Sequence, residues 1–95
     1  MTAAIATITN HHERSVFAAV RASAPRFPHL ADEDLLADIA CVALNRLPPR
    51  YIRHEVDFAF YLTDKERAEN ERAIAEAVAF AFEFVQARMA MRARA

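Results

Sequence analysis

The chain has 95 residues, a formal net charge of −1, no glycine and one cysteine. The lack of glycine excludes the glycine-rich loops that cradle phosphates, and the charge balance excludes the basic surface of a nucleic-acid binder. One cysteine excludes an internal disulfide, and no apolar run is long enough to span a membrane, so we expect one cytoplasmic domain with no nucleic-acid or membrane partner.

The predicted domain occupies residues 10–92 and follows a tail over residues 1–9 that we expect to be flexible. A first helix is expected over residues 11–24, because Asn10 with Glu13 three residues later is close to a capping box. Two prolines, which fix φ and remove backbone donors, end this helix in a stiff corner.

A second helix is expected over residues 32–46. Its acidic first turn complements the helix dipole, and apolar residues recur along it at helical spacing. Pro48 disfavours the α conformation at Leu47, so the helix must end there.

The spacing of apolar residues changes from helical to every second residue over residues 55–62, where apolar side chains alternate with Asp57, Ala59 and Tyr61. Alternation of this kind is typical of a short strand or extended arm. One short strand cannot stand alone, so we expect it to pair with its copy in a second chain.

A third helix is expected over residues 64–92, opened by a capping box from Thr63 to Glu66. Its apolar residues form two stripes, whereas a three-helix monomer needs one. The second stripe, which contains Phe80 and Phe84, predicts a dimer; a single wide core face is the alternative. The predicted fold class is thus mainly α: a homodimeric three-helix domain with a possible short strand between its second and third helices.

The most informative segment is residues 43–51, which read ALNRLPPRY. Pro48 and Pro49 make this corner rigid, which lowers the entropic cost of presenting side chains to a ligand. Arg46 and Arg50 flank the corner, and Tyr51 follows directly. Two guanidinium forks beside an aromatic ring suit a phosphate and a flat base.

Four further residues complete the candidate ligand-binding site. Asp38 and Asn45 are seven residues apart and share a helix face, where a carboxylate could accept hydrogen bonds from a guanine edge. Arg14 and His54 are added because their side chains can donate hydrogen bonds to a ligand and because they lie close in the sequence to Asn10 and to residues 43–51, respectively. The alternatives are a corner that only stops a helix, a solvated face, and an Arg50 that pairs with a nearby carboxylate.

Catalysis and metal binding are not expected. Neither serine lies in a nucleophile-elbow sequence, and none of the four histidines has a second ligand at metal-binding spacing. We therefore expect no enzyme activity, no cofactor and no metal.

Residues 38–51, which read DIACVALNRLPPRY, resemble the signature of the late-competence ComFB family, and Asn10, Glu13 and Val16 match its upstream pattern. The resemblance covers roughly residues 10–85. It implies a small helical dimer and a receptor for cyclic dinucleotides, mainly cyclic di-GMP, linked to competence, pili and motility.

The chain departs from the family in one respect. Many relatives carry a cysteine cluster, associated with zinc, before the Asp-Ile helix, whereas residues 23–30 here contain no cysteine. The leading hypothesis is a cytosolic cyclic-dinucleotide receptor, with a downstream effector protein as a further partner. The alternative is a protein–protein adaptor with no small-molecule ligand.

Overall fold

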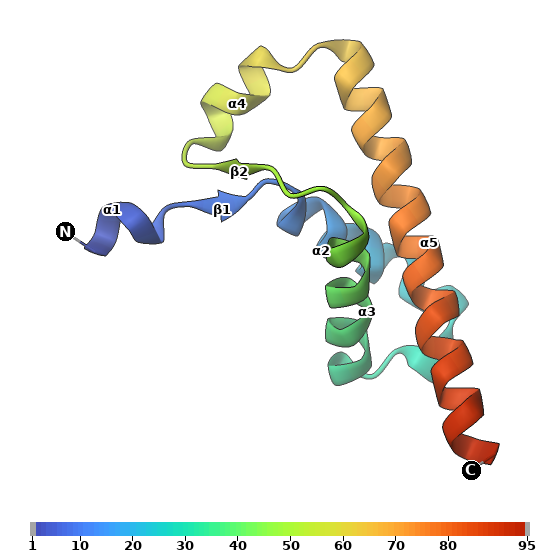
Figure 1. Ribbon diagram of the computed structural model, residues 1–95. Helices are drawn as coiled ribbons and strands as arrows, with labels where there is room; N and C mark the ends of the chain where they lie inside the picture. The colour runs from blue at the N-terminus through green and yellow to red at the C-terminus, as the bar shows by residue number, and fades with distance from the viewer. Residues whose placement is uncertain (1, 95) are drawn as a thin grey trace.

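The computed structural model describes residues 2–94, and its architecture is mainly helical (Figure 1). The elements in chain order are α1 (Thr2–Ala6), β1 (Thr9–Asn10), α2 (His12–Ser23), the 3-10 turns η1 (Ala24–Arg26) and η2 (Pro28–Leu30), α3 (Glu33–Arg46), β2 (Tyr51–Ile52), α4 (Glu55–Tyr61) and α5 (Asp64–Arg94). The three long helices confirm the expected ones within two residues at each end. The short helices α1 and α4 were not predicted, so the three-helix count was wrong.

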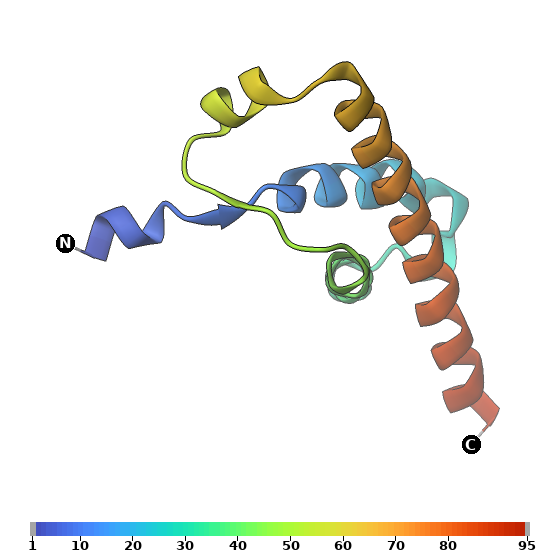
Figure 2. The same ribbon diagram turned by 45° about the horizontal axis from the view of Figure 1, so that its top comes forward.

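The core lies where α2, α3 and α5 pack together, with α5 running past the other two (Figures 1 and 2). Its largest fully buried side chains are Phe82, Leu30, Ile39 and Val16. Phe27 stacks on Phe82 with ring centroids 4.6 Å apart. Burying a side chain of this size stabilises a fold by roughly 1.5–3 kcal/mol, so this small set supplies much of the stability.

Only the middle of α5 contributes buried residues, between Ala77 and Val85. The second stripe predicted on this helix does not form one uniform exposed surface. Ala77 lies in the core, Phe80 is half-buried, and Phe84 is 39% exposed. This stripe is therefore shared between the core and the surface.

The strand predicted over residues 55–62 is wrong, because this segment forms helix α4. The amide of Phe58 donates to the carbonyl of His54 at 3.1 Å, which is a helical i to i−4 bond. Seven residues make only about two helical turns, so alternation over so short a segment also fits a helix. In that helix Val56 and Phe60 lie one turn apart on a shared face.

The short sheet forms elsewhere. Strands β1 and β2 pair antiparallel, with Thr9 opposite Ile52 and Asn10 opposite Tyr51. Part of the segment expected as a tail therefore has regular structure, since it carries α1 and β1. This pairing brings the start of α2 beside the proline corner, about 40 residues later in the chain.

Two local predictions concern the helix ends. The predicted cap of α5 by Thr63 is confirmed, because the amide of Glu66 donates to Thr63 Oγ1 at 3.1 Å. The Glu66 carboxylate accepts from the Thr63 hydroxyl at 3.2 Å, whereas the full capping box has it accept from the Thr63 backbone amide. Between α2 and α3, the predicted stiff corner consists of η1 and η2, each with a proline in its first turn.

Within residues 2–94, no helix combines the length and hydrophobicity needed to cross a membrane.

Candidate functional site

The proline corner begins where α3 ends. Leu47 has an extended backbone with ψ of 136°, as a residue before proline favours, and its side chain is buried in the core. Pro48 and Pro49 are exposed and lead into β2. The corner is therefore anchored at its first residue and presents its prolines outward.

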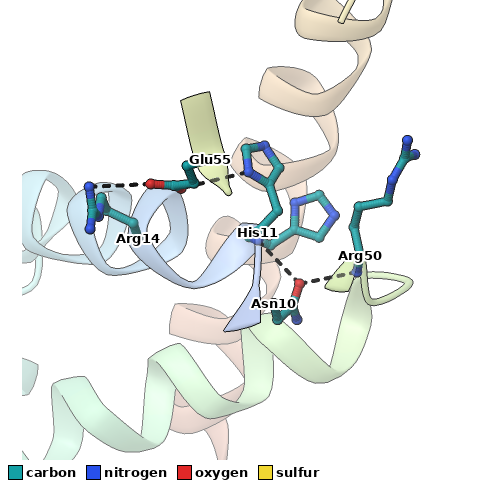
Figure 3. Close-up of polar contacts among 6 residues, drawn as sticks. Asn10, His11, Arg14, Arg50 and Glu55 are labelled. Carbon is teal, nitrogen blue, oxygen red and sulfur yellow. Dashed lines mark hydrogen bonds and ion pairs between the residues drawn. The ribbon is translucent and has the colours of Figure 1, made fainter. Parts of the chain in front are cut away.

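Asn10 fastens the corner to the start of α2 (Figure 3). Its Oδ1 accepts hydrogen bonds from the backbone amides of Arg50, at 3.1 Å, and His12, at 3.2 Å. The carbonyl of Arg50 in turn accepts a bond from the amide of His11 at 2.7 Å. Asn10 lies one residue before the observed N-cap, so its predicted capping role becomes a bridge between two segments.

Helix α4 supplies an aromatic platform for Arg50. The Arg50 guanidinium carbon lies 4.7 Å from the centroid of the Phe58 ring, and that ring lies 4.4 Å from the ring of His11. A guanidinium that stacks through its face keeps its in-plane N–H donors for a second partner. The backbone of Arg50 is held by hydrogen bonds while its side chain rests on Phe58, which is the preorganisation that an anion site needs.

Glu55 lies close to both Arg14 and His11 beside this cluster. Its carboxylate lies 3.4 Å from the guanidinium of Arg14 and 3.8 Å from Nδ1 of His11 (Figure 3). The Arg14 side chain is 85% exposed, so this pair contributes little to stability. The suggested pairing of Arg50 with a carboxylate is replaced here by stacking on Phe58.

His12 lies buried beneath the junction. Burial lowers the pKa of its imidazole, and the neighbouring His11 and Arg50 lower it further, while a hydrogen bond with the carbonyl of Pro48 opposes the shift. The lowered pKa means that His12 becomes protonated less readily than an exposed histidine, which limits the positive charge beneath Arg50.

Arg46 lies on a second aromatic platform, at the other end of the corner. Its guanidinium carbon is 3.9 Å from the centroid of the Phe80 ring of α5. Phe80 stacks on Phe84 with centroids 5.7 Å apart, and Arg88 lies over Phe84 at 5.8 Å. Both arginines of the motif are thus stacked on aromatic rings, each on a different helix.

Asp38 and Asn45 share a helix face as predicted, and they line a groove of about 370 Å³ between α3 and α5. They line it with Arg88 and Arg92 rather than with Arg46 or Arg50. The amide of Asn45 donates to the carbonyl of Cys41 at 3.0 Å. The predicted base-reading pair therefore lies apart from the residues that surround Arg50.

Tyr51, Arg14 and His54 lie on the strand and helix ends near Arg50. Tyr51 is 68% exposed on β2, directly opposite Asn10. Arg14 lines a polar groove of about 440 Å³, together with Arg53. His54 precedes α4 and is exposed, so its imidazole is accessible to a ligand.

Sequence reasoning missed several residues that build this arrangement. It gave Asn10 a role as a helix cap and a place in the family pattern but no role at the proline corner, and it did not consider His11, Glu55 and Phe58 together. The match of Asn10 to the upstream family pattern was a usable signal. The spacing of Phe58 and Glu55 held no such signal, because that segment was predicted to be a strand.

No cluster of three potential metal ligands occurs within the described part of the chain.

The family model described as "Late competence development protein ComFB" matches residues 9–89. No curated protein and no solved structure matches the chain. The matched range includes the proline corner, the Asn10 bridge, α4 and most of α5.

Proposed function

The chain belongs to the ComFB family, which indicates a competence-related function, and we propose that it is a cytosolic receptor for a cyclic dinucleotide, with cyclic di-GMP favoured. In this proposal it binds a second messenger without catalysing a reaction. A downstream effector protein would then respond to the bound form and link it to competence, pili or motility.

The observation that carries the proposal is the fixed position of Arg50. Its amide and carbonyl are tied to Asn10 and His11, and its guanidinium rests on Phe58. A phosphate or a guanine edge accepts two parallel hydrogen bonds from such a fork. Because Arg50 is already oriented, little of the binding energy is lost in ordering it.

The remaining residues have roles that follow from their chemistry. Arg46, stacked on Phe80, is a second fork for phosphate or guanine. Tyr51 is exposed and offers a ring for base stacking. Asp38 and Asn45 lie beside Arg88 and Arg92 in the groove between α3 and α5, which offers both acceptors and cations to a guanine base.

The proposed receptor is a homodimer. A cyclic dinucleotide has two equivalent halves, and a homodimer repeats each binding residue about a two-fold axis. Each half of the ligand could therefore meet the same set of side chains.

Isothermal titration of the purified protein with cyclic di-GMP tests the proposal, with separate titrations of cyclic di-AMP and GTP as controls. Arg50→Ala should weaken binding about 10- to 100-fold, since a charge-assisted hydrogen bond contributes about 1.5–3 kcal/mol. Arg50→Lys should bind at an intermediate level, because lysine keeps the charge and loses the fork. Arg26→Ala is the matched control, because Arg26 is an exposed arginine on η1.

Saturable binding that Arg50→Ala weakens and Arg26→Ala leaves unchanged would support the proposal. No heat with any nucleotide, from folded protein, would refute it. Equal binding by Arg50→Ala and the wild type would refute the assignment of the site.

An adaptor without a small ligand is the second candidate. Phe84 and Met91 are exposed on α5 by 39% and 70%, which offers apolar surface to another protein. An adaptor would keep its partner after Arg50→Ala and lose it after Phe84→Asp. A pull-down with both variants therefore separates the two candidates.

A further inference from the structure

The most exposed large apolar side chains of the described chain are gathered on α4. Val56 is 82% exposed, Phe60 is 87% exposed and Tyr61 is 81% exposed. Val56 and Phe60 are four residues apart, so they lie on one face of the helix. Full burial of one such side chain is worth roughly 1.5–3 kcal/mol, and α4 leaves this stabilisation unused.

The opposite side of the same helix is attached to the rest of the domain. Phe58 lies against the ring of His11 and under Arg50, and Glu55 pairs with Arg14. The ribbon views show α4 standing away from α3 and α5, with the segments before and after it extended (Figures 1 and 2). The helix therefore has a fixed inner side and an uncovered outer face.

The surface of the whole chain is too large for a compact monomer. The chain exposes 7062 Å², whereas a folded monomer of 10.7 kDa exposes about 5500 Å². Its radius of gyration is 15.4 Å, against about 12.4 Å for a compact domain of 95 residues. The excess of roughly 1500 Å² is comparable with what each chain buries in an extensive dimer interface.

We propose that the outer face of α4, formed by Val56, Phe60 and Tyr61, packs against a second copy of this chain and is a central part of a homodimer interface. A second copy fits because these three exposed side chains are largely apolar, with the exposed carboxylate of Asp57 between Phe60 and Tyr61 on the helix surface, and because each copy has the same excess surface to bury. Closed two-fold dimers are also the commonest assemblies of identical chains.

The inference rests on the dimer of the proposed function and is independent of the nucleotide. It places the interface on α4 rather than on the stripe of α5 that contains Phe84. It also links assembly to the site, since α4 carries the Phe58 ring under Arg50. Covering the outer face of α4 would hold that platform in place.

Light scattering coupled to gel filtration tests the interface with the full chain. The wild type should have twice the 10.7 kDa chain mass, and Phe60→Asp should have the mass of one chain. Phe84→Asp is the matched control, because it makes the same substitution at an exposed phenylalanine of α5 and should remain dimeric. Far-ultraviolet circular dichroism shows whether each variant keeps its helices.

A monomeric wild type, or a Phe60→Asp variant that stays dimeric, would overturn the inference. So would a Phe84→Asp variant that becomes monomeric while Phe60→Asp stays dimeric, which would return the interface to α5.

A unique thiol gives a second, independent measurement. Cys41 is the only cysteine, so Cys41→Ser with Val56→Cys places one thiol on the outer face of α4. Maleimide should label it at least about tenfold more slowly in the dimer than after Phe60→Asp is added, because dimerisation buries it. Equal labelling rates, with a dimer present, would overturn the inference even if Phe60→Asp fails to fold.

The titration with cyclic di-GMP tests the receptor function independently of the dimer interface. A dimer that depends on Phe60 but binds no cyclic di-GMP supports the interface and refutes the receptor. A monomer that binds cyclic di-GMP refutes the interface and leaves the receptor standing.

Discussion

Replacing Asn10 with alanine should both destabilise the fold and loosen the candidate site. Asn10 Oδ1 accepts hydrogen bonds from two backbone amides, that of His12 at 3.2 Å and that of Arg50, 40 residues further along the chain than Asn10, at 3.1 Å. Alanine keeps the Cβ and removes the acceptor, so both amides lose their partner. The contact with His12 is partly buried, whereas the contact with Arg50 is exposed.

The expected cost follows from these two environments. A partly buried donor left unpaired costs about 1–3 kcal/mol, and an exposed hydrogen bond contributes about 0.5–1.5 kcal/mol. The sum is about 1.5–4.5 kcal/mol, which lowers Tm by roughly 6–36 °C in a domain of this size. The backbone of Arg50 also loses one of its two anchors, so nucleotide affinity should fall with stability.

Urea denaturation followed by circular dichroism measures the change, at one protein concentration because a dimer's stability depends on concentration. Asn10→Asp is the control, because aspartate keeps the acceptor and suits a helix N-terminus. A loss below about 0.5 kcal/mol for Asn10→Ala, or an equal loss for Asn10→Asp, would refute the assigned role of the bridge.

Three further predictions concern the core, pH and a helix cap. Phe82→Ala should cost about 3–5 kcal/mol and abolish most of the cooperative urea transition, whereas a loss under 1 kcal/mol would show that Phe82 is not central to the core. Because the folded-state pKa of His12 is lowered from 6.5, its contribution to stability is complete above pH 6.5 and declines as the pH falls below that value; His12→Gln should remove this part of the decline, and identical pH profiles would contradict it. Thr63→Ala should cost about 1 kcal/mol in the same denaturation assay by removing the cap of α5, while Thr63→Ser should cost less than half of that.

The long helices were predictable because their signals are local. Pro48 stops α3 at Leu47 by steric exclusion, and the Thr63 cap opens α5, so both boundaries follow from neighbouring residues alone. The shared face of Asp38 and Asn45 follows from helix geometry in the same way. Such features depend on no distant part of the chain.

The rest of the site depends on contacts between distant segments. The Asn10 bridge needs the pairing of β1 with β2. Each of these strands has only two residues, which is too few for a sequence pattern to predict a strand. Phe58 was assigned to a strand because its segment is too short for period alone to separate strand from helix. The stacking of Arg46 on Phe80 likewise joins α3 to α5, and only the packing of these helices reveals it.

The prolines in the turns between α2 and α3 reduce the conformational entropy of the unfolded chain as well as fixing the folded backbone. These turns are led by Pro25 and Pro28, the sequence has no glycine, and no residue within 2–94 has a positive φ. Glycine widens the set of unfolded conformations and proline narrows it, each by an amount worth up to about 1 kcal/mol per residue. This chain therefore gives up less conformational entropy on folding than a glycine-rich chain of equal length, which helps a domain with so few large core side chains to remain folded.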